Sequence, residues 1–295
     1  MKVKIPPKIF KYVGPERIDI IKHLTVRFTQ PSCCNDPFEA QTCIEGLEDE
    51  SLLREQMERI DREKYRTHVL RNGPILAGTF EEFRKLIGSD YDAAIKAVKA
   101  DLSGSRQRAA AATRTFWDTL GLLSLTETEN NILMWAHYTD GHKGMLLEFD
   151  PAHSFLKPPD CDHPNPDERQ NDIQFGAMAP VTYSTKRPRR RLGEQFRIAD
   201  FFTKSPQWGY EHEWRVIQLL ERSHTQKQTP GGMVHLFTIP PECVRRVVIG
   251  CCMGAQNRAE LLKAIRSNAQ LKHVQIQETQ LDLDVFQLNY VSVQQ

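Results

Sequence analysis

The sequence predicts an α+β fold in which helices pack on a mixed, mostly antiparallel sheet and a helical layer is inserted into the chain. Short apolar runs typical of strands occur near the start and through the second half. From 46 to about 116, apolar residues recur instead at helical spacing among Glu, Arg, Lys and Ala. The order of these elements indicates a single α+β domain over 1–295 with a helical insertion at about 46–116.

The first 116 residues contain two expected strands, a short helix and the insertion. Residues 9–13 alternate and end at Gly14-Pro15, which is typical of a strand closed by a turn. Asn35 and Asp36 favour a turn because their side chains hydrogen-bond nearby backbone, and Pro37 disfavours helical geometry before it. The expected elements are a strand over 9–13, a helix over 17–24, a strand over 25–29, a turn cluster over 30–38 and helices over 46–116, broken near 72–74 and 103–105.

The second half of the chain is predicted to supply most of the sheet. Thr126 and Glu129 have the spacing of a capping box, which starts a helix. Residues 151–172 are rich in Pro, Asp, Asn and His, which favours a long loop. The expected elements are strands over 121–126, 144–149, 180–183, 211–220 and 233–239, a strand ending near 250, helices over 126–138, 193–204 and 256–269, and strands at the C-terminus.

Charge and cysteine content restrict the classes of partner. Because 39 Lys and Arg face 38 Asp and Glu, no global field draws the protein to nucleic acid or to an anionic membrane. No stretch of about 18 apolar residues and no signal peptide occurs, so we expect a soluble, cytoplasmic protein without a membrane partner. The seven cysteines form no Cys-x-x-Cys repeat, which favours reduced thiols over disulfides or a zinc ribbon.

Two carboxylates and a guanidinium are candidates for a catalytic site on the strand expected over 211–220. Alternation along a strand places Glu211, Glu213 and Arg215 on one face. Neighbouring carboxylates in a partly dry cleft raise the pKa of at least one of them, and a nearby Arg opposes that shift. The alternative is a solvated strand face on which an Arg is paired with a Glu.

Hydroxyl groups and a basic run are further candidates. Ser124 and Thr126 share one strand face, so both hydroxyls can point into the same cleft, although Thr126 can equally cap the next helix. Residues 186–191 contain five cations in six positions, which suffices for a local phosphate-binding patch. Such a run is more often a solvated loop.

Histidines gather near the end of the helix expected over 126–138. His137, Tyr138 and His142 lie close together there, and a His at a helix C-terminus can be only a capping group because the helix dipole favours its charge. A metal site that combines the histidines with residues 160–163 is disfavoured, because the His-x4-His spacing crosses Gly141 outside a regular helix. We therefore expect no metal.

Six motifs together carry a resemblance to known proteins. They are Phe10-Lys11-Tyr12, Asn35-Asp36-Pro37-Phe38, Ser124-x-Thr126, Met134-Trp135-x-His137-Tyr138, His142-Lys143-Gly144 and Trp208-x-Tyr210-Glu211-x-Glu213-Trp214-Arg215. Their combination resembles a widespread bacterial domain family that carries only a label of unknown function. The resemblance spans most of the chain outside the helical insertion, and it supplies no activity.

The order of the motifs is also distantly similar to that of the ADP-ribosyltransferase superfamily. That superfamily has a first strand with an aromatic or basic residue, then a Ser-x-Ser/Thr strand and a late Glu-x-Glu strand. The similarity implies that Glu213 bonds the ribose 2′-hydroxyl of NAD while Glu211 orients the attacking group. The further NAD contacts that it implies are Lys11, Tyr12, Ser124, Thr126, His137, Tyr138 and Arg215. The chain departs from the Ser-x-Ser/Thr subgroup at Lys11-Tyr12, where that subgroup has Arg.

These patterns lead to one expected function and two alternatives. We expect an ADP-ribosyltransferase-like enzyme that cleaves the nicotinamide–ribose bond of NAD to modify a protein or nucleic acid, or to hydrolyse NAD, as a toxin or phage-defence effector. The first alternative is a non-catalytic module that holds nucleic acid or a phosphorylated partner in the same cleft with help from the basic run. The second is a metal-assisted nuclease that uses His137 and His142.

Overall fold

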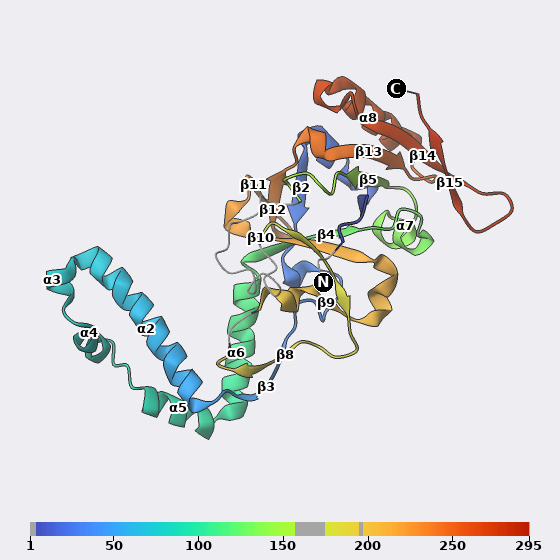
Figure 1. Ribbon diagram of the computed structural model, residues 1–295. Helices are drawn as coiled ribbons and strands as arrows, with labels where there is room; N and C mark the ends of the chain where they lie inside the picture. Colours follow the sequence, from blue (N-terminus) through green and yellow to red (C-terminus); the bar gives the residue numbers. More distant parts are fainter. Residues whose placement is uncertain (1–3, 157–174, 195–196, 295) are drawn as a thin grey trace. The chain divides into compact units, whose positions relative to one another are not determined.

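The chain forms two compact units. The computed structural model describes residues 4–156, 175–194 and 197–294 (Figure 1). The first unit contains residues 1–40, 116–186 and 198–295, and the second contains residues 41–115 and 187–197. Most of the loop expected over 151–172 lies outside the described residues, and so does the segment 160–163 that was weighed as a metal ligand.

The first unit is built on an eight-stranded sheet with the order β15-β14-β13-β5-β1-β4-β10-β6. Its strands are β1 (Ile9–Val13), β4 (Leu120–Thr126), β5 (Met145–Phe149), β6 (Met178–Pro180), β10 (Glu213–Leu219), β13 (Val244–Ile249), β14 (Gln275–Leu281) and β15 (Leu288–Ser292). Neighbouring strands are antiparallel apart from β13 and β14, which run parallel. This architecture confirms the predicted α+β class with a mixed, mostly antiparallel sheet.

Helices and side chains cover both faces of the sheet. The helices of this unit are α1 (Asp19–His23), α7 (Ile132–Tyr138) and α8 (Ala255–Ser267). Because alternate residues of a strand point to opposite sides, Ile9 and Val13 join the hydrophobic cluster that includes α1 and α8. Phe10 and Tyr12 join the other cluster, around Trp135 of α7. Fully burying such side chains contributes roughly 1.5–3 kcal/mol each, so β1 is fixed from both sides.

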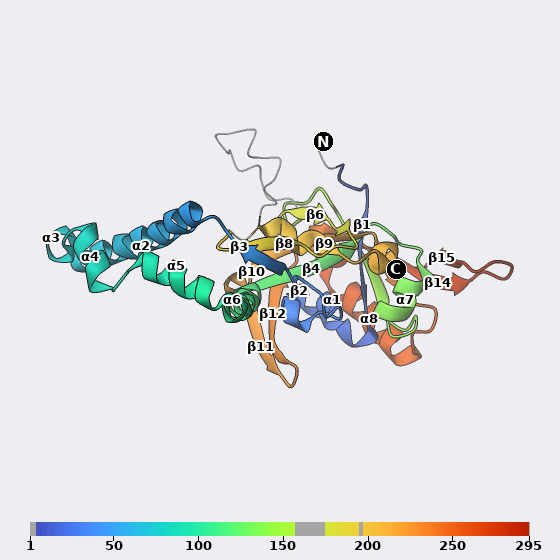
Figure 2. The same cartoon turned by 90° about the horizontal axis from the view of Figure 1, so that it is seen from below.

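Shorter elements complete the first unit. Strands β11 (Thr225–Thr229) and β12 (Gly232–Thr238) form a hairpin that pairs with β2 (Thr25–Phe28) and projects from the sheet (Figure 2). Strands β7 (Thr182–Tyr183) and β9 (Thr203–Lys204) pair in parallel. The 3₁₀ helices are η1 (Pro15–Arg17), η2 (Pro31–Cys33), η4 (Ile198–Phe202), η5 (Pro206–Glu211), η6 (Leu220–Arg222), η7 (Pro241–Cys243) and η8 (Ala269–Leu271).

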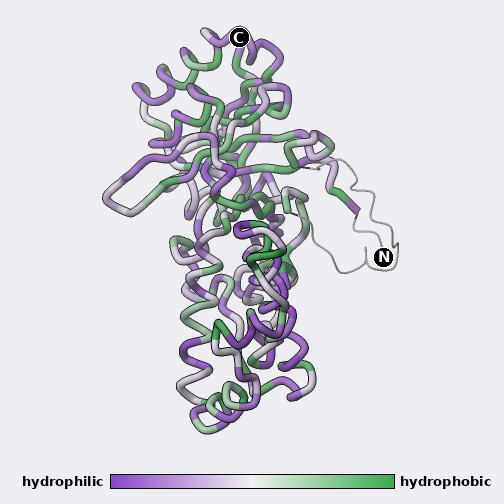
Figure 3. The backbone as a smooth tube through the Cα atoms, turned by 90° about the vertical axis from the view of Figure 1, so that its left-hand side faces the viewer, coloured by the Kyte–Doolittle hydropathy of each residue, from purple (hydrophilic) through white to green (hydrophobic). Residues whose placement is uncertain are grey.

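The second unit is mainly helical, which confirms the predicted insertion. Its helices are α2 (Glu50–Asn72), α3 (Pro74–Ala77), α4 (Phe80–Leu86), α5 (Tyr91–Ala100) and α6 (Leu102–Trp117), of which the last continues into the first unit. The side chain of Asp49 caps α2, and Thr79 with Glu82 forms a capping box on α4. Hydrophilic stretches recur along these helices (Figure 3), in keeping with the few buried apolar residues that α2 contributes.

The second half of the basic run, Arg189 to Arg191, lies in a strand and not in a loop. Residues Arg189–Leu192 form β8, which pairs in parallel with β3 (Cys43–Leu47) of the same unit. Arg189 pairs with Glu45, and the buried Arg190 donates a hydrogen bond to Thr113 Oγ1 at 2.7 Å. Arg189 and Arg190 are therefore paired with neighbouring side chains of the same unit.

Three predicted elements differ from those in the structure, two in where they begin and one in its type. Helix α7 begins after Asn131, whose side chain caps the helix by accepting from the backbone N–H groups of Leu133 and Met134, so Thr126 and Glu129 form no capping box. The helix expected over 193–204 is the 3₁₀ helix η4 followed by β9. The strand expected from 211 begins at Glu213, because η5 ends at Glu211 and His212 takes a left-handed conformation with φ of 43°.

Candidate functional site

A cavity opens where β1 and β4 separate. In the described part of the chain these strands pair at one position, Phe10 with Thr126, and Thr29 pairs with Leu122 further along the same edge of β4. Between these two contacts the carbonyl of Ser124 has no strand partner on that edge, and Lys11 Nζ donates a hydrogen bond to it at 3.1 Å. The cavity has a volume of about 230 Å³, and Lys11 and Ser124 form part of its wall.

The pairing of β10 with β4 gathers the predicted polar residues on one face. Glu213 lies opposite Thr126, and Arg215 lies opposite Ser124. Because residues directly opposite one another in an antiparallel pair project to the same side, all four side chains leave the sheet together. Ser124, Thr126 and Glu213 line the cavity, whereas the fully buried Arg215 lies behind Glu213 and does not.

Glu211 also lines the cavity, but it lies before β10, so the alternation of side chains along a strand does not explain its position. It is the last residue of η5, and the left-handed turn at His212 redirects the chain into β10. The hydroxyl of Thr126 donates a hydrogen bond to the carbonyl of Glu211 at 2.5 Å and so ties the turn to β4. The carboxylate of Glu211 accepts a hydrogen bond from Tyr138 of α7 and lines the cavity beside Glu213.

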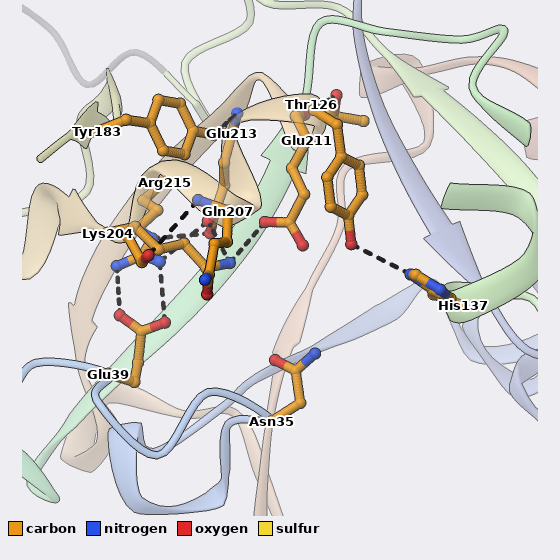
Figure 4. Close-up of polar contacts among 12 residues, drawn as sticks. Asn35, Glu39, Thr126, His137, Tyr183, Lys204, Gln207, Glu211, Glu213 and Arg215 are labelled. Carbon is orange, nitrogen blue, oxygen red and sulfur yellow. Dashed lines mark hydrogen bonds and ion pairs between the residues drawn. The ribbon is translucent and has the colours of Figure 1, made fainter. Parts of the chain in front are cut away.

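A cluster of buried charges surrounds the two carboxylates (Figure 4). Lys204 Nζ donates to Glu211 Oε2 at 2.5 Å and to Glu213 Oε2 at 3.0 Å. Arg215 binds Glu213 through Nε at 2.7 Å and Nη2 at 3.0 Å, and binds both oxygens of Glu39 at 2.6 and 3.0 Å. Each of these five residues is at most 7% exposed. Three carboxylates face two cations in this cluster, and Lys11, which lines the same cavity, supplies a third cation.

The balance between burial and neighbouring charges shifts the pKa values of Glu211 and Glu213 in opposite directions. Burial alone would raise the pKa of Glu213, but Arg215 and Lys204 outweigh it and lower the pKa to about 2. Burial raises the pKa of Glu211, and Lys204 and Tyr138 oppose this rise only in part. For Lys204, the two carboxylates outweigh burial and raise its pKa. Glu213 is therefore a fixed anion at neutral pH, while Glu211 takes up a proton more readily.

Of the remaining predicted contact residues, three line the cavity and one does not. Lys11, Tyr12 and Tyr138 line the cavity, and burial lowers the pKa of Lys11 to about 8. The hydroxyl of Tyr12 is engaged with the carbonyls of Thr128 and Glu129, at 3.1 and 2.7 Å. His137 is exposed, faces Tyr210 with 3.1 Å between Nδ1 and the hydroxyl, and does not line the cavity.

Sequence reasoning missed several cavity residues. Lys204 and Cys34 stand out among them, together with Glu39, which directly follows the Asn35-Asp36-Pro37-Phe38 motif. Its position next to this motif was the one sequence signal that could have indicated Glu39. No sequence motif surrounds Lys204, so no signal in the sequence indicated that residue. Burial raises the pKa of the Cys34 thiol to about 12, so the thiol is protonated at neutral pH.

The described ranges contain neither a group of metal ligands nor a helix that could span a membrane. Within residues 4–156, 175–194 and 197–294 no three His, Cys, Asp or Glu side chains are grouped so that they could hold a metal ion. His142 instead stacks on Trp135 at a ring distance of 6.2 Å. Across the same ranges, every helix is too short or too polar to cross a bilayer.

Comparison with known proteins identifies one segment. Residues 134–216 match the family described as "Protein of unknown function (DUF2971)". The match includes the Met134-to-Tyr138 motif and the segment that ends at Arg215, so the resemblance to an uncharacterised domain family is confirmed for this segment. No curated protein and no solved structure shows significant similarity to the chain.

Proposed function

We propose that the first unit is an NAD-cleaving enzyme of the ADP-ribosyltransferase type, in which Glu213 is the catalytic carboxylate. One observation carries the proposal. Glu213 is 4% exposed, is held at both oxygens by cations, and lines a cavity together with the hydroxyl-bearing residues Ser124 and Thr126. An anion fixed beside the hydroxyl of Ser124 suits the ribose of a nucleotide at the bond that breaks, while the hydroxyl of Thr126 is already bonded to the carbonyl of Glu211.

The chemistry follows from the charge that develops during glycosidic cleavage. As nicotinamide leaves, the ribose ring acquires the positive charge of an oxocarbenium ion. Glu213 is ionised at neutral pH because its pKa is about 2, and the bonds from Arg215 and Lys204 already fix its orientation. Such a preorganised anion stabilises charge that exists mainly in the transition state. Its oxygens also accept hydrogen bonds from ribose hydroxyls.

The size and charge of the cavity suit part of a dinucleotide. Ligand pockets usually span about 300–1,000 Å³. A volume of about 230 Å³ therefore admits the nicotinamide riboside portion and leaves the rest of NAD outside. Lys11, whose pKa is about 8, is mostly charged at neutral pH and offers the pyrophosphate a cation.

The acceptor and the setting are further parts of the proposal. Glu211 lies next to Glu213 and takes up a proton more readily, as suits a group that orients and deprotonates an attacking nucleophile. The order of the sequence motifs, which is distantly similar to that of ADP-ribosyltransferases, supports a macromolecular acceptor, either protein or nucleic acid, and a cytoplasmic effector of the toxin or phage-defence kind. Hydrolysis of NAD is the same reaction with water as acceptor.

Release of nicotinamide tests the proposal. The protein is incubated with NAD, alone and with protein or nucleic-acid acceptors, and nicotinamide is measured by chromatography. We expect release by the wild type and at least about 100-fold less by Glu213→Gln, because removing one preorganised electrostatic group costs about 10²–10³ in kcat.

A matched control separates chemistry from folding. Glu148 accepts a hydrogen bond from the buried Arg246 at 2.6 Å and does not line the cavity, so Glu148→Gln weakens a comparable ion pair elsewhere. This variant is expected to retain activity. No release by the wild type under any condition, or equal release by Glu213→Gln, would count against the proposed activity.

A further inference from the structure

Lys204 is the shared partner of both carboxylates in the cavity. It lies on β9, which is held in place by parallel pairing with β7, and it is 7% exposed. Its ammonium group contacts Glu211 and Glu213 at 2.5 and 3.0 Å, and it lies over the ring of Trp208 at 4.6 Å from the centroid. Moving this buried ammonium group away from the two carboxylates would leave buried charges uncompensated, which is strongly unfavourable.

The two carboxylates depend on Lys204 to different degrees. Glu213 is also held by Arg215 through two hydrogen bonds. Glu211 is 3% exposed, and among the described residues Lys204 is the cation that contacts it. Its other side-chain partner is the hydroxyl of Tyr138. Removing Lys204 therefore leaves Glu213 paired and leaves Glu211 as a buried charge without a counter-ion.

The other groups that face Glu211 do not replace this cation. Glu213 carries the same charge and opposes ionisation of Glu211. Tyr138 of α7, Tyr183 of β7 and Tyr210 of η5 are phenols whose own pKa values are raised, first by burial, so they are neutral at ordinary pH. A buried carboxylate among neutral phenols and a second carboxylate takes up a proton unless a cation is present.

We propose that Lys204 is a positioning residue that keeps Glu211 ionised and directed into the cavity beside Glu213, and thereby sets the pH range in which Glu211 can accept a proton from an attacking nucleophile. The last step rests on the proposed NAD-cleaving function. The effect of Lys204 on the ionisation of Glu211 does not, because it follows from burial and contacts alone.

Carboxyl titration tests the proposal without any activity. Protein labelled with ¹³C at the glutamate carboxyl carbons is titrated by NMR, and the signal that disappears in Glu211→Gln is assigned to Glu211. We expect Lys204→Met to raise the titration midpoint of Glu211 by about one pH unit or more, and Lys204→Arg to return it toward the wild-type value. The Glu213 signal is expected to remain that of an ionised group in all three proteins.

Thermal unfolding supplies an independent measurement. We expect Lys204→Met to lose more stability at pH 8 than at pH 5.5, because the unpaired Glu211 must be protonated in the folded state and ionises in the unfolded state. Replacing Glu211 as well, in Lys204→Met/Glu211→Gln, is expected to recover part of the loss at pH 8. If Lys204→Met does not fold, Lys204→Gln, which retains a hydrogen-bond donor without the charge, takes its place.

The outcomes separate this inference from the proposed function. An unchanged Glu211 midpoint in Lys204→Met, or a double variant no more stable at pH 8 than the single one, overturns the role of Lys204. Absence of nicotinamide release by the wild type overturns the NAD-cleaving function and leaves the titration result standing. If release does occur, the acidic limb of its pH profile is expected to move upward in Lys204→Met together with the NMR midpoint.

Discussion

At the scale of the residue, the two carboxylates of the cavity show how burial and partners decide ionisation. Glu211 and Glu213 lie two positions apart and share Lys204, yet their pKa values move in opposite directions. The difference comes from Arg215, which contacts Glu213 and is itself fixed by Glu39. Arg215, which the sequence suggested as a ligand contact, therefore serves to keep Glu213 ionised.

The low pKa of Glu213 predicts acid sensitivity. Its pKa falls from 4.5 to about 2 on folding, which amounts to roughly 3 kcal/mol of stability at neutral pH. Because the folded pKa is the lower one, this stability is complete above about pH 5 and is lost as the pH falls toward 2. Denaturant unfolding of wild type and Glu213→Gln between pH 6 and 3 should show the difference between them shrinking on acidification. A pH-independent difference would mean that Glu213 is not held ionised by folding.

Part of the site was predictable from the sequence at this scale. The two-residue period of strands placed Ser124 with Thr126 on one face and Glu213 with Arg215 on one face, and the register of β4 with β10 brings the two pairs to the same side of the sheet. Glu211 was assigned to the same cleft through a strand that does not extend that far. Lys204 could not be found, since its contacts depend on the position of β9 and on no local pattern.

At the scale of the element, the junction between η5 and β10 controls the aim of Glu211. His212 adopts the left-handed conformation there, which costs a β-branched residue far more than Asn or Gly. We expect His212→Val to lower the free energy of unfolding by about 1 kcal/mol, and His212→Asn to leave it nearly unchanged. Chemical denaturation measures both. The two variants lose the same weak contact with Glu127, at 3.6 Å, so the comparison isolates the backbone.

The hairpin of β14 and β15 combines an ordered turn with an exposed apolar tip. The carboxylate of Asp282 accepts hydrogen bonds from the backbone of Asp284 and Val285 and from Asn289, at 2.9, 3.0 and 2.9 Å. We expect Asp282→Ala to accelerate amide exchange of residues 284 and 285, as measured by NMR. Phe286→Ser is the control within the same turn: this ring is fully exposed, so stability should change by no more than about 0.5 kcal/mol. Unchanged exchange in Asp282→Ala would show that the turn is held by other means.

Elements with a strong local signal were the predictable ones. The strand over 9–13 was placed correctly from its alternation and the Gly-Pro that follows, and the strand over 144–149 differs from β5 by one residue. The last three residues of the basic run became part of β8 because β3 offers them a parallel partner, which five cations in six positions gave no reason to expect. The start of α7 was missed because Asn131 caps it, while the hydroxyl of Thr126 binds Glu211 instead.

At the scale of the whole molecule, the two units differ in the size of their cores. The first contains three hydrophobic clusters on its sheet, whereas buried apolar side chains of the second include few large ones, such as Leu53, Phe83 and Ile95. Because opening free energies follow buried apolar contacts, we expect amides of α2 to α5 to exchange with solvent faster than those of β4, β5 and β13. Hydrogen exchange followed by mass spectrometry measures this. Equal protection in both units would mean that they unfold as one.

The central sheet is continuous in order but weakly joined at one place. β1 pairs with β5 at five positions and with β4 at one. The five strands from β15 to β1 are therefore joined to β4, β10 and β6 by the single backbone pairing position of Phe10 with Thr126. Separating β1 from β4 would break this one backbone pairing position, and it would also break the hydrogen bonds from Lys11 to Ser124 and from Tyr12 to Thr128 and Glu129. The wall of the pocket beside Lys11 therefore depends more on side-chain hydrogen bonds than on backbone pairing, so a substitution of Lys11 or Tyr12 removes much of what joins the two parts of the sheet there.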